Sequence, residues 1–157
     1  MFGDAITEFG EASANDIGQL LIAAADVASD DFVKRINAAG FPSIRASHFP
    51  VFGTLDPEGT HISVMAKRAG MSRQGMSALV KDVEKQGFVS TSADTTDRRA
   101  IVVALTETGA QFCREAAKMS AEINRELTAA MGADRVVLLR EALAAIAHRD
   151  PSSTARP

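Results

Sequence analysis

The chain has 157 residues with a formal net charge of −3, one cysteine, and neither tryptophan nor tyrosine. This length supports one ordinary globular core without a structural metal, and a lone cysteine excludes an internal disulfide. The longest apolar runs are far shorter than the ~20 residues of a membrane span, and residues 1–33 hold no basic side chain of the kind that opens a signal peptide, so we expect a cytoplasmic protein with no membrane partner.

Helix signals dominate the first third of the chain. Apolar residues at three- and four-residue spacing predict a helix over residues 14–39, and Gly40 followed by Pro42 predicts its end. A second, short helix is expected to start with Ser47 as N-cap. Pro50 would then lie in the first turn, where its missing N–H has no partner inside the helix.

Two further helices are expected over residues 62–70 and 73–86, with Ser63 and Ser72 as N-caps. A tight turn containing Gly70 joins them, which is typical of a helix-turn-helix. After residue 87 the pattern becomes strand-like over 88–91 and 100–105, and the polar loop 92–99 joins the two strands as a hairpin.

Two long amphipathic helices complete the prediction, one over residues 107–131 with Thr106 as cap and one over 134–148. Residues 150–157 are expected to be disordered. The predicted fold class is therefore mainly α with a small β-hairpin (α+β). The two apolar stripes consist of Phe112, Ala116, Met119, Ile123 and Leu127, and of Val136, Leu139, Leu143 and Ile146.

The helix over 73–86 has two chemically different faces at about 100° per residue. One face is apolar and must pack on the body of the domain; it holds Met76, Leu79, Val80 and Val83. The opposite face is polar or small and holds Gln74, Ser77, Ala78, Lys81 and Lys85. Amide, hydroxyl and ammonium groups match the hydrogen-bonding edges of the DNA major groove, although any solvated amphipathic helix also has polar residues outside.

Charge along the chain supports the interpretation as a DNA-binding helix. Residues 1–60 carry three basic and nine acidic side chains, residues 61–99 carry seven basic and four acidic ones, and residues 100–157 carry seven of each. Attraction to phosphate is screened within about 8–10 Å, so the local excess matters more than the total. The alternative is ordinary variation of surface charge.

The hairpin loop carries a specific motif. Asp94-Thr95-Thr96-Asp97-Arg98-Arg99 runs into an apolar strand and then Leu105-Thr106-Glu107-Thr108-Gly109. This pattern resembles the wing of the MarR family of winged helix-turn-helix transcriptional regulators, which has an acidic-x-x-Asp-Arg-Arg loop, an apolar strand and Leu-Thr-x-x-Gly. Residues 62–89 are similar to the paired helices of the family. Thr95 departs from it, since a proline often follows the first acidic residue.

A physical argument that does not depend on the resemblance also supports DNA contact by the hairpin loop. Arginines at a hairpin tip can enter a narrow, strongly negative minor groove, and Asp97 would structure the tip by holding an arginine or loop N–H groups. The predicted DNA contacts are Ser72, Arg73, Gln74, Ser77, Lys81, Arg98 and Arg99.

The resemblance implies a homodimeric, sequence-specific regulator of double-stranded DNA with a pseudo-palindromic operator. It would be a repressor released by a small aromatic or phenolic effector. The implied organisation is an N-terminal dimerisation helix (1–45), a winged helix-turn-helix domain (46–106), C-terminal dimerisation helices (107–149) and a tail (150–157). The alternative is a winged helix that binds DNA nonspecifically, or another protein, without ligand sensing.

The resemblance also implies a ligand pocket involving His48, Phe49, Phe52 and Phe112. The alternative is that each phenylalanine is simply core and that His48 is a surface residue of a first helical turn. We expect Cys113 to be a buried, inert thiol rather than a redox sensor. His48, His61 and His148 lack metal-ligand spacing, and no hydrolase, metalloprotease or phosphate-loop motif is present, so neither an enzyme nor a cofactor is expected.

Overall fold

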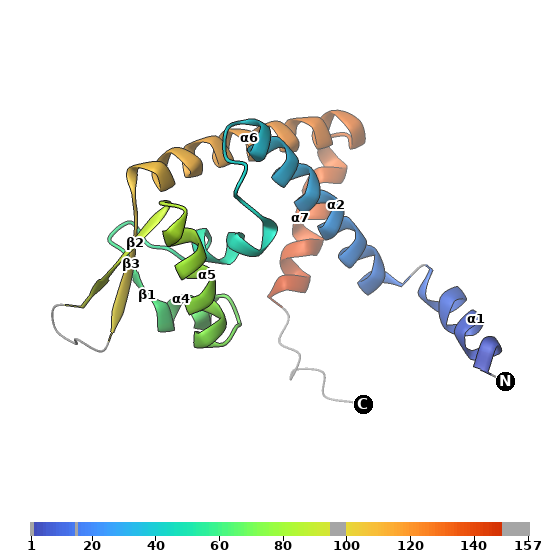
Figure 1. Cartoon of the computed structure of the whole chain (residues 1–157). Coiled ribbons are helices and arrows are strands. Elements are labelled where there is room, and N and C mark those ends of the chain that lie inside the picture. The colour runs from blue at the N-terminus through green and yellow to red at the C-terminus, as the bar shows by residue number, and fades with distance from the viewer. Residues whose placement is uncertain (1, 15, 95–99, 149–157) are drawn as a thin grey trace. The chain divides into compact units, whose positions relative to one another are not determined.

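The structure, a computed structural model, describes residues 2–14, 16–94 and 100–148. It divides into two compact units, Met1–Ala116 and Ala117–Pro157. In chain order the elements are α1 (Phe2–Ser13), α2 (Ile17–Ala38), the 3₁₀ helix η1 (Ala46–His48), α3 (Phe49–Phe52), β1 (Thr60–His61), α4 (Ile62–Arg68), α5 (Arg73–Lys85), β2 (Val89–Ala93), β3 (Ile101–Leu105), α6 (Glu107–Met131) and α7 (Ala133–Ala147) (Figure 1). The predicted class, mainly helical with a small sheet, is confirmed.

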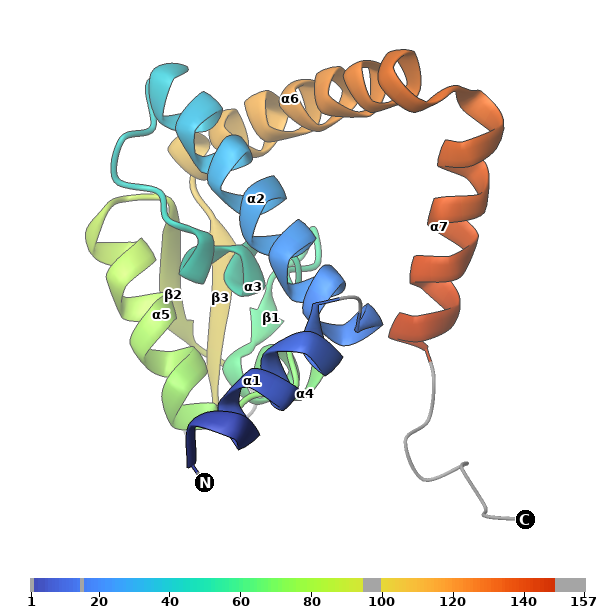
Figure 2. The ribbon, with the colours of Figure 1, turned by 90° about the vertical axis from the view of Figure 1, so that its right-hand side faces the viewer.

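The sheet has three antiparallel strands in the order β1-β3-β2 (Figure 2). β2 and β3 form the predicted hairpin, in register from Val89 opposite Leu105 to Ala93 opposite Ile101. β1 was not predicted. It is only two residues long and exists because Thr60 and His61 pair with Val103 and Val102, a contact between distant segments that no local pattern indicates.

Several predicted helix starts need correction. The first long helix starts at Ile17 rather than 14, because the Asp16 side chain accepts a hydrogen bond from the Gln19 N–H at 3.0 Å and caps it. Helix α1 was not predicted at all. Ser47 lies inside η1 and caps nothing, while Pro50 still falls in the first turn of α3. Ser63 lies inside α4, which begins after His61 without a side-chain cap.

Two predicted caps are confirmed. The Ser72 hydroxyl accepts from the Gly75 N–H at 3.0 Å at the start of α5, and the Thr106 hydroxyl accepts from the Gly109 N–H at 3.1 Å at the start of α6. The same Thr106 hydroxyl donates to the Gly87 carbonyl at 2.6 Å. Thr106 thereby connects the end of the hairpin to the end of α5.

The core of the first unit lies between the helices and the sheet. Its fully buried side chains include Ile36 from α2, Met76 and Val80 from α5, and Val103 from β3. Four phenylalanine rings gather at one end of this core, with centroids 4.4–6.2 Å apart: Phe41, Phe52, Phe88 and Phe112. Burial of the two enclosed rings, Phe88 and Phe112, contributes about 1.5–3 kcal/mol each, so this cluster holds the start of α6 against the segments before it.

Gly109 permits the close approach of α6 to the end of α5. A Cβ placed on Gly109 would lie 2.0 Å from the Phe88 carbonyl oxygen, so no larger residue fits without movement of the backbone. The glycine of the Leu-Thr-x-x-Gly motif therefore has a packing role.

Candidate nucleic-acid interface

Helix α5 presents the two faces that its sequence predicts. Met76, Val80 and Val83 are buried, and Leu79 is half-buried. Arg73, Gln74, Ala78, Lys81 and Lys85 are exposed on the other side, while Ser77 is half-buried. The exposed face therefore combines one amide, a small residue and three cations, in an arrangement that can contact base edges and phosphates.

The predicted contact Ser72 already has a structural role. Its side chain caps α5 by accepting the Gly75 N–H, which satisfies one of the free donors at the helix start. A hydroxyl can still donate its own proton to a phosphate while it accepts this bond. Arg73 and Gln74 follow it in the first turn of the helix and are exposed.

Polar contacts of two half-buried side chains connect α5 to two other segments. The Glu84 Oε1 atom accepts from both the N–H and the hydroxyl of Thr91 in β2, each at 2.7 Å. On the other side, Asp82 accepts from the Arg45 guanidinium and lies 3.1 Å from His48 Nε2. These hydrogen bonds supplement the apolar packing and set the position of the helix.

The hairpin leads to the predicted wing tip. The Asp94 N–H donates to the Ala100 carbonyl at 3.0 Å and closes its base, and the Asp94 carboxylate lies 2.8 Å from His61 Nε2 of β1. Three predicted wing residues, Asp97, Arg98 and Arg99, lie outside the described residues. Their roles stay predictions.

An aromatic cavity of about 370 Å³ lies in the same unit. Its lining consists of Phe32, Phe49, Phe52, Gly53, Phe112, Cys113 and Ala116. Three of the four predicted pocket residues are among them. Phe32 and Cys113 were not predicted as lining residues, because Phe32 lies on α2, well separated in sequence from the other segments, and Cys113 could be inferred only from its adjacency to Phe112.

His48 lies elsewhere than predicted. It is fully buried, not a surface residue, and it is not among the residues that line the cavity. Its imidazole instead accepts from the Arg45 N–H at 3.2 Å and lies beside Asp82. The sequence offers no local signal for this arrangement, since Asp82 follows His48 by 34 residues.

Cys113 is half-buried, and burial raises the pKa of its thiol above the ordinary value. A raised pKa leaves less of the nucleophilic thiolate at neutral pH. This agrees with the expectation of an unreactive side chain.

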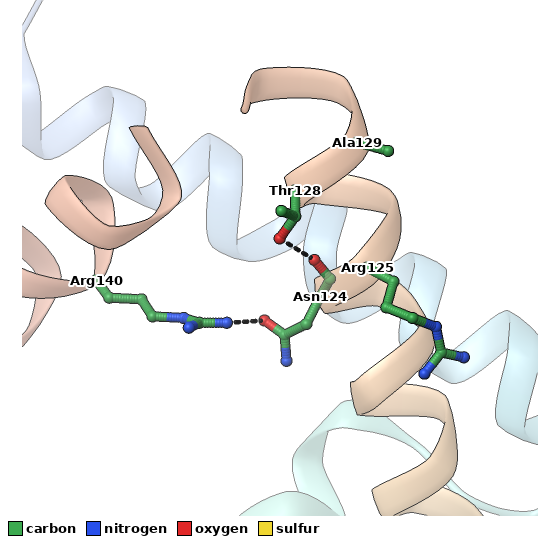
Figure 3. A pocket seen from close by; sticks show the side chains of 5 residues that line it. All are labelled: Asn124, Arg125, Thr128, Ala129 and Arg140. Carbon is green, nitrogen blue, oxygen red and sulfur yellow. Dashed lines mark hydrogen bonds between the residues drawn. The ribbon is translucent and has the colours of Figure 1, made fainter. Parts of the chain in front are cut away.

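A second cavity, of about 480 Å³, lies in the C-terminal unit and is lined by Asn124, Arg125, Thr128, Ala129 and Arg140. Figure 3 shows Arg140 reaching Asn124, whose Oδ1 accepts its hydrogen bond at 3.0 Å, while Arg125 points away from that pair. The two guanidinium groups therefore do not converge on a common anion.

Within residues 2–14, 16–94 and 100–148, no group of three or more His, Cys, Asp or Glu side chains could hold a metal ion. No helix in those ranges is long and apolar enough to cross a membrane.

Comparisons with known proteins agree with this geometry. Residues 43–100 match the model of the MarR family, which confirms the resemblance seen in the sequence. No curated protein matches the chain. A MarR transcriptional regulator from Methanosarcina mazei Go1 has the same fold at 19% identity, with a TM-score of 0.71 and coverage of 83% of this chain and 92% of that one.

Two structures of the regulator CouR are also similar. One is CouR, described as a transcriptional repressor, bound to a 23-mer DNA duplex. It is 24% identical, with a TM-score of 0.71 and coverage of 86% of this chain and 94% of that one. CouR from Rhodococcus jostii RHA1 bound to p-coumaroyl-CoA is 26% identical, with a TM-score of 0.64 and coverage of 88% and 96%. The Methanosarcina mazei protein is thus described as a transcriptional regulator and DNA-bound CouR as a transcriptional repressor.

Proposed function

We propose that this chain, whose winged helix-turn-helix segment is that of the MarR family, is a homodimeric regulator that binds a specific DNA sequence. The observation that carries the proposal is the exposed face of α5, where Arg73, Gln74 and Lys81 stand outside while the opposite face is buried. DNA-bound CouR, a relative of the same fold, supports it. In this proposal Gln74 and Ser77 contact base edges, whereas Ser72, Arg73, Lys81, Arg98 and Arg99 contact phosphates or the minor groove.

Exposed apolar side chains support the homodimer. On α2, Ile17 is 68% exposed and Val27 is 71% exposed; on α7, Leu138 is 64% exposed. Apolar side chains gathered on helices to this extent mark an interaction surface. A two-fold dimer would place two copies of α5 about one DNA turn, roughly 34–36 Å, apart and would select a pseudo-palindromic site.

The aromatic cavity is our candidate for the effector site. Its lining is apolar and mostly aromatic, which favours a small aromatic or phenolic compound. Ligand-bound CouR supports effector binding in relatives of this fold. Repression is the simplest outcome of DNA binding, because occlusion of a promoter needs no further contacts.

A selection of bound sequences from a random pool of duplex DNA tests the central proposal. We expect an enriched pseudo-palindrome, bound at least about 10³-fold more tightly than unrelated DNA. Binding with a steep salt dependence but no sequence preference would instead support nonspecific DNA binding. Absence of any DNA binding would refute the proposal and favour a role in protein contact.

A further inference from the structure

A polar cluster with one buried member, His48, and two partly exposed members, Arg45 and Asp82, joins the segment before α3 to helix α5. His48 has no exposed surface, and its Nε2 lies 3.1 Å from Asp82 Oδ2. The Arg45 guanidinium donates to the same Oδ2 atom, and Gln86 Nε2 donates to Asp82 Oδ1 at 3.1 Å. Both carboxylate oxygens of Asp82 are thus occupied. We call Arg45, His48 and Asp82 the polar cluster.

The contacts of His48 determine where its proton lies. Its Nδ1 accepts from the Arg45 backbone N–H at 3.2 Å. With Nδ1 as the acceptor, Nε2 is left to donate. It has two neighbours at 3.1 Å, Asp82 Oδ2 and an Arg45 guanidinium nitrogen, and only the carboxylate oxygen can accept a hydrogen. The imidazole therefore connects the backbone of the segment before α3 to the carboxylate of α5 in one defined orientation.

The same short segment forms part of the aromatic cavity. η1 and α3 are contiguous, so His48 is followed directly by Phe49, and Phe52 lies one turn later. Phe49 packs against Phe32 with ring centroids 5.3 Å apart, and Phe52 packs against Phe112 at 4.4 Å. One run of helical turns, residues 46–52, thus bears cavity-lining rings at one end and the polar cluster at the other.

A short helical run moves as a body when one end is displaced, because its internal hydrogen bonds hold it together. The Phe49 N–H donates to the Ala46 carbonyl across the turn that holds His48, and the Gly53 N–H donates to the Phe49 carbonyl at 2.9 Å. A molecule in the cavity that shifts Phe49 or Phe52 therefore also shifts His48. Since loss of one partner leaves a buried polar group without a hydrogen bond, which is unfavourable, Asp82 and α5 must follow His48 or lose the contact.

We propose that the polar cluster couples the aromatic cavity to α5, with His48 as the positioning residue that transmits cavity occupancy to the DNA-binding face. This inference rests on the proposed function, because its readout is DNA affinity. It differs from a direct clash between ligand and DNA, since neither His48 nor Asp82 has to touch either one.

The only cysteine of the chain offers a way to fill the cavity without knowing the effector, because Cys113 is one of its lining residues. Benzyl methanethiosulfonate transfers a benzylthio group to the Cys113 thiolate as a mixed disulfide and releases methanesulfinate. Burial raises the pKa of this thiol, so the reaction is run at alkaline pH and its completion is measured by mass spectrometry. Cys113→Ser treated in the same way controls for effects away from the cavity.

The measurement is the Kd for the selected DNA duplex before and after modification. For the wild-type chain we expect the modified protein to bind at least about fivefold more weakly, the lower end of ordinary coupling between sites. Treated and untreated Cys113→Ser should bind equally. For each variant, the coupling factor is the Kd of the modified protein divided by the Kd of the same protein before modification.

Two substitutions of His48 then separate coupling from simple structural support. In His48→Gln, the side-chain amide nitrogen takes the place of Nε2 and can still donate to Asp82. In His48→Asn, the shorter amide can keep the contact with the Arg45 N–H but cannot reach Asp82. We expect His48→Gln to retain the coupling factor and His48→Asn to reduce it to near one. Asp82→Asn, measured in parallel, should also reduce the coupling factor. It replaces His48→Asn as the test variant if His48→Asn does not fold.

The remaining outcomes distinguish failure of the proposed function from failure of the coupling. If the unmodified wild-type chain binds no DNA, the proposed function fails. If it binds DNA and benzylthiolation leaves the Kd unchanged, the proposed function stands but the coupling does not exist. If His48→Asn and Asp82→Asn bind DNA more weakly yet keep the wild-type coupling factor, the polar cluster is only structural and the inference is overturned.

Discussion

The polar residues of α5 and its cap have different chemical tasks. Ser72 closes the helix end by accepting the Gly75 N–H, whereas Gln74 and Lys81 extend into solvent on the exposed face. An amide can read adenine through two hydrogen bonds, but an ammonium group acts mainly as a charge near phosphate. The two exposed side chains should therefore contribute differently to DNA binding.

We expect Gln74→Ala to relax preference at particular base pairs, with a loss of about 1–3 kcal/mol for the favoured base there. Lys81→Ala is the matched comparison. It should weaken binding to all sequences and lower the slope of log K against log salt by about one. Binding curves for the operator and for its single-base variants, at several salt concentrations, check both expectations. A uniform loss in Gln74→Ala would show that Gln74 does not read a base.

The carboxylate of Asp82 makes a pH-dependent contribution to stability. Hydrogen bonds from the side chains of His48 and Gln86 lower its pKa below the ordinary value of 3.8, and the nearby Arg45 charge acts in the same direction. Because the pKa is lower in the folded state, the stabilisation is complete above the unfolded-state value and is lost as the pH falls through the folded-state value.

The stabilisation that the Asp82 carboxylate gives the wild-type chain over Asp82→Asn should therefore shrink once the pH falls below 3.8, the ordinary value of this group. Denaturant titrations from about pH 5 downwards measure it. A difference that grows on acidification would contradict the assigned contacts of Asp82.

Three helices, α2, α5 and α6, begin where a side chain accepts one of their first N–H groups. The sequence therefore predicted the starts of α5 and α6 correctly from Ser72 and Thr106. It failed for α3 and α4, where serine was available but the adjoining contacts of His48 and the pairing of β1 determine the start. A serine therefore predicts the start of a helix only where no tertiary contact fixes the neighbouring backbone in another arrangement.

Gly109 connects elements rather than shaping its own helix. We expect Gly109→Ala to lower the free energy of unfolding by about 3 kcal/mol, the cost of overpacking, because the added Cβ would lie 2.0 Å from the Phe88 carbonyl oxygen. Gly10→Ala in α1, where no atom lies within 4 Å of the added Cβ, is the control and should change stability by no more than about 1 kcal/mol, in the stabilising direction, because alanine favours a helix more than glycine does. Denaturant unfolding measures both. An equally small effect at Gly109 would refute the close approach.

At the scale of the whole molecule, many large apolar side chains lie outside the core and are exposed. The second unit alone has Leu138 and Val137 at least half exposed, together with partly exposed Leu139, Leu143 and Ile146. A second copy of the chain that packs on these side chains would remove them from contact with water, which is favourable. At this scale the homodimer is the proposal that accounts for the helices outside the DNA-binding segment.

Leu138→Glu should convert the dimer to monomers, because it places a charge in the proposed apolar contact. Ser63→Glu on α4 adds the same charge at an exposed position in the other unit and should leave the dimer intact. Sedimentation velocity at matched concentrations distinguishes the two. A Leu138→Glu variant that sediments as a folded dimer would contradict the proposed interface.

The sequence alone determined the features that depend on neighbours along the chain. These are the amphipathic faces of α5, the caps at Ser72 and Thr106, the β2–β3 hairpin, and the motif that indicates the family. Their physical cause is local, since helical period, capping and turn chemistry act within a few residues.

Only the tertiary structure decided the position of His48, the existence of β1 and the full lining of the cavity. His48 meets Asp82 across 34 positions, Thr60 meets Val103, and Phe32 joins Phe112 in one cavity. Each depends on which distant segments pack together. The pattern of the sequence shows that His48 lies in an early helical turn, but the burial of its imidazole against α5 is a property of the folded core.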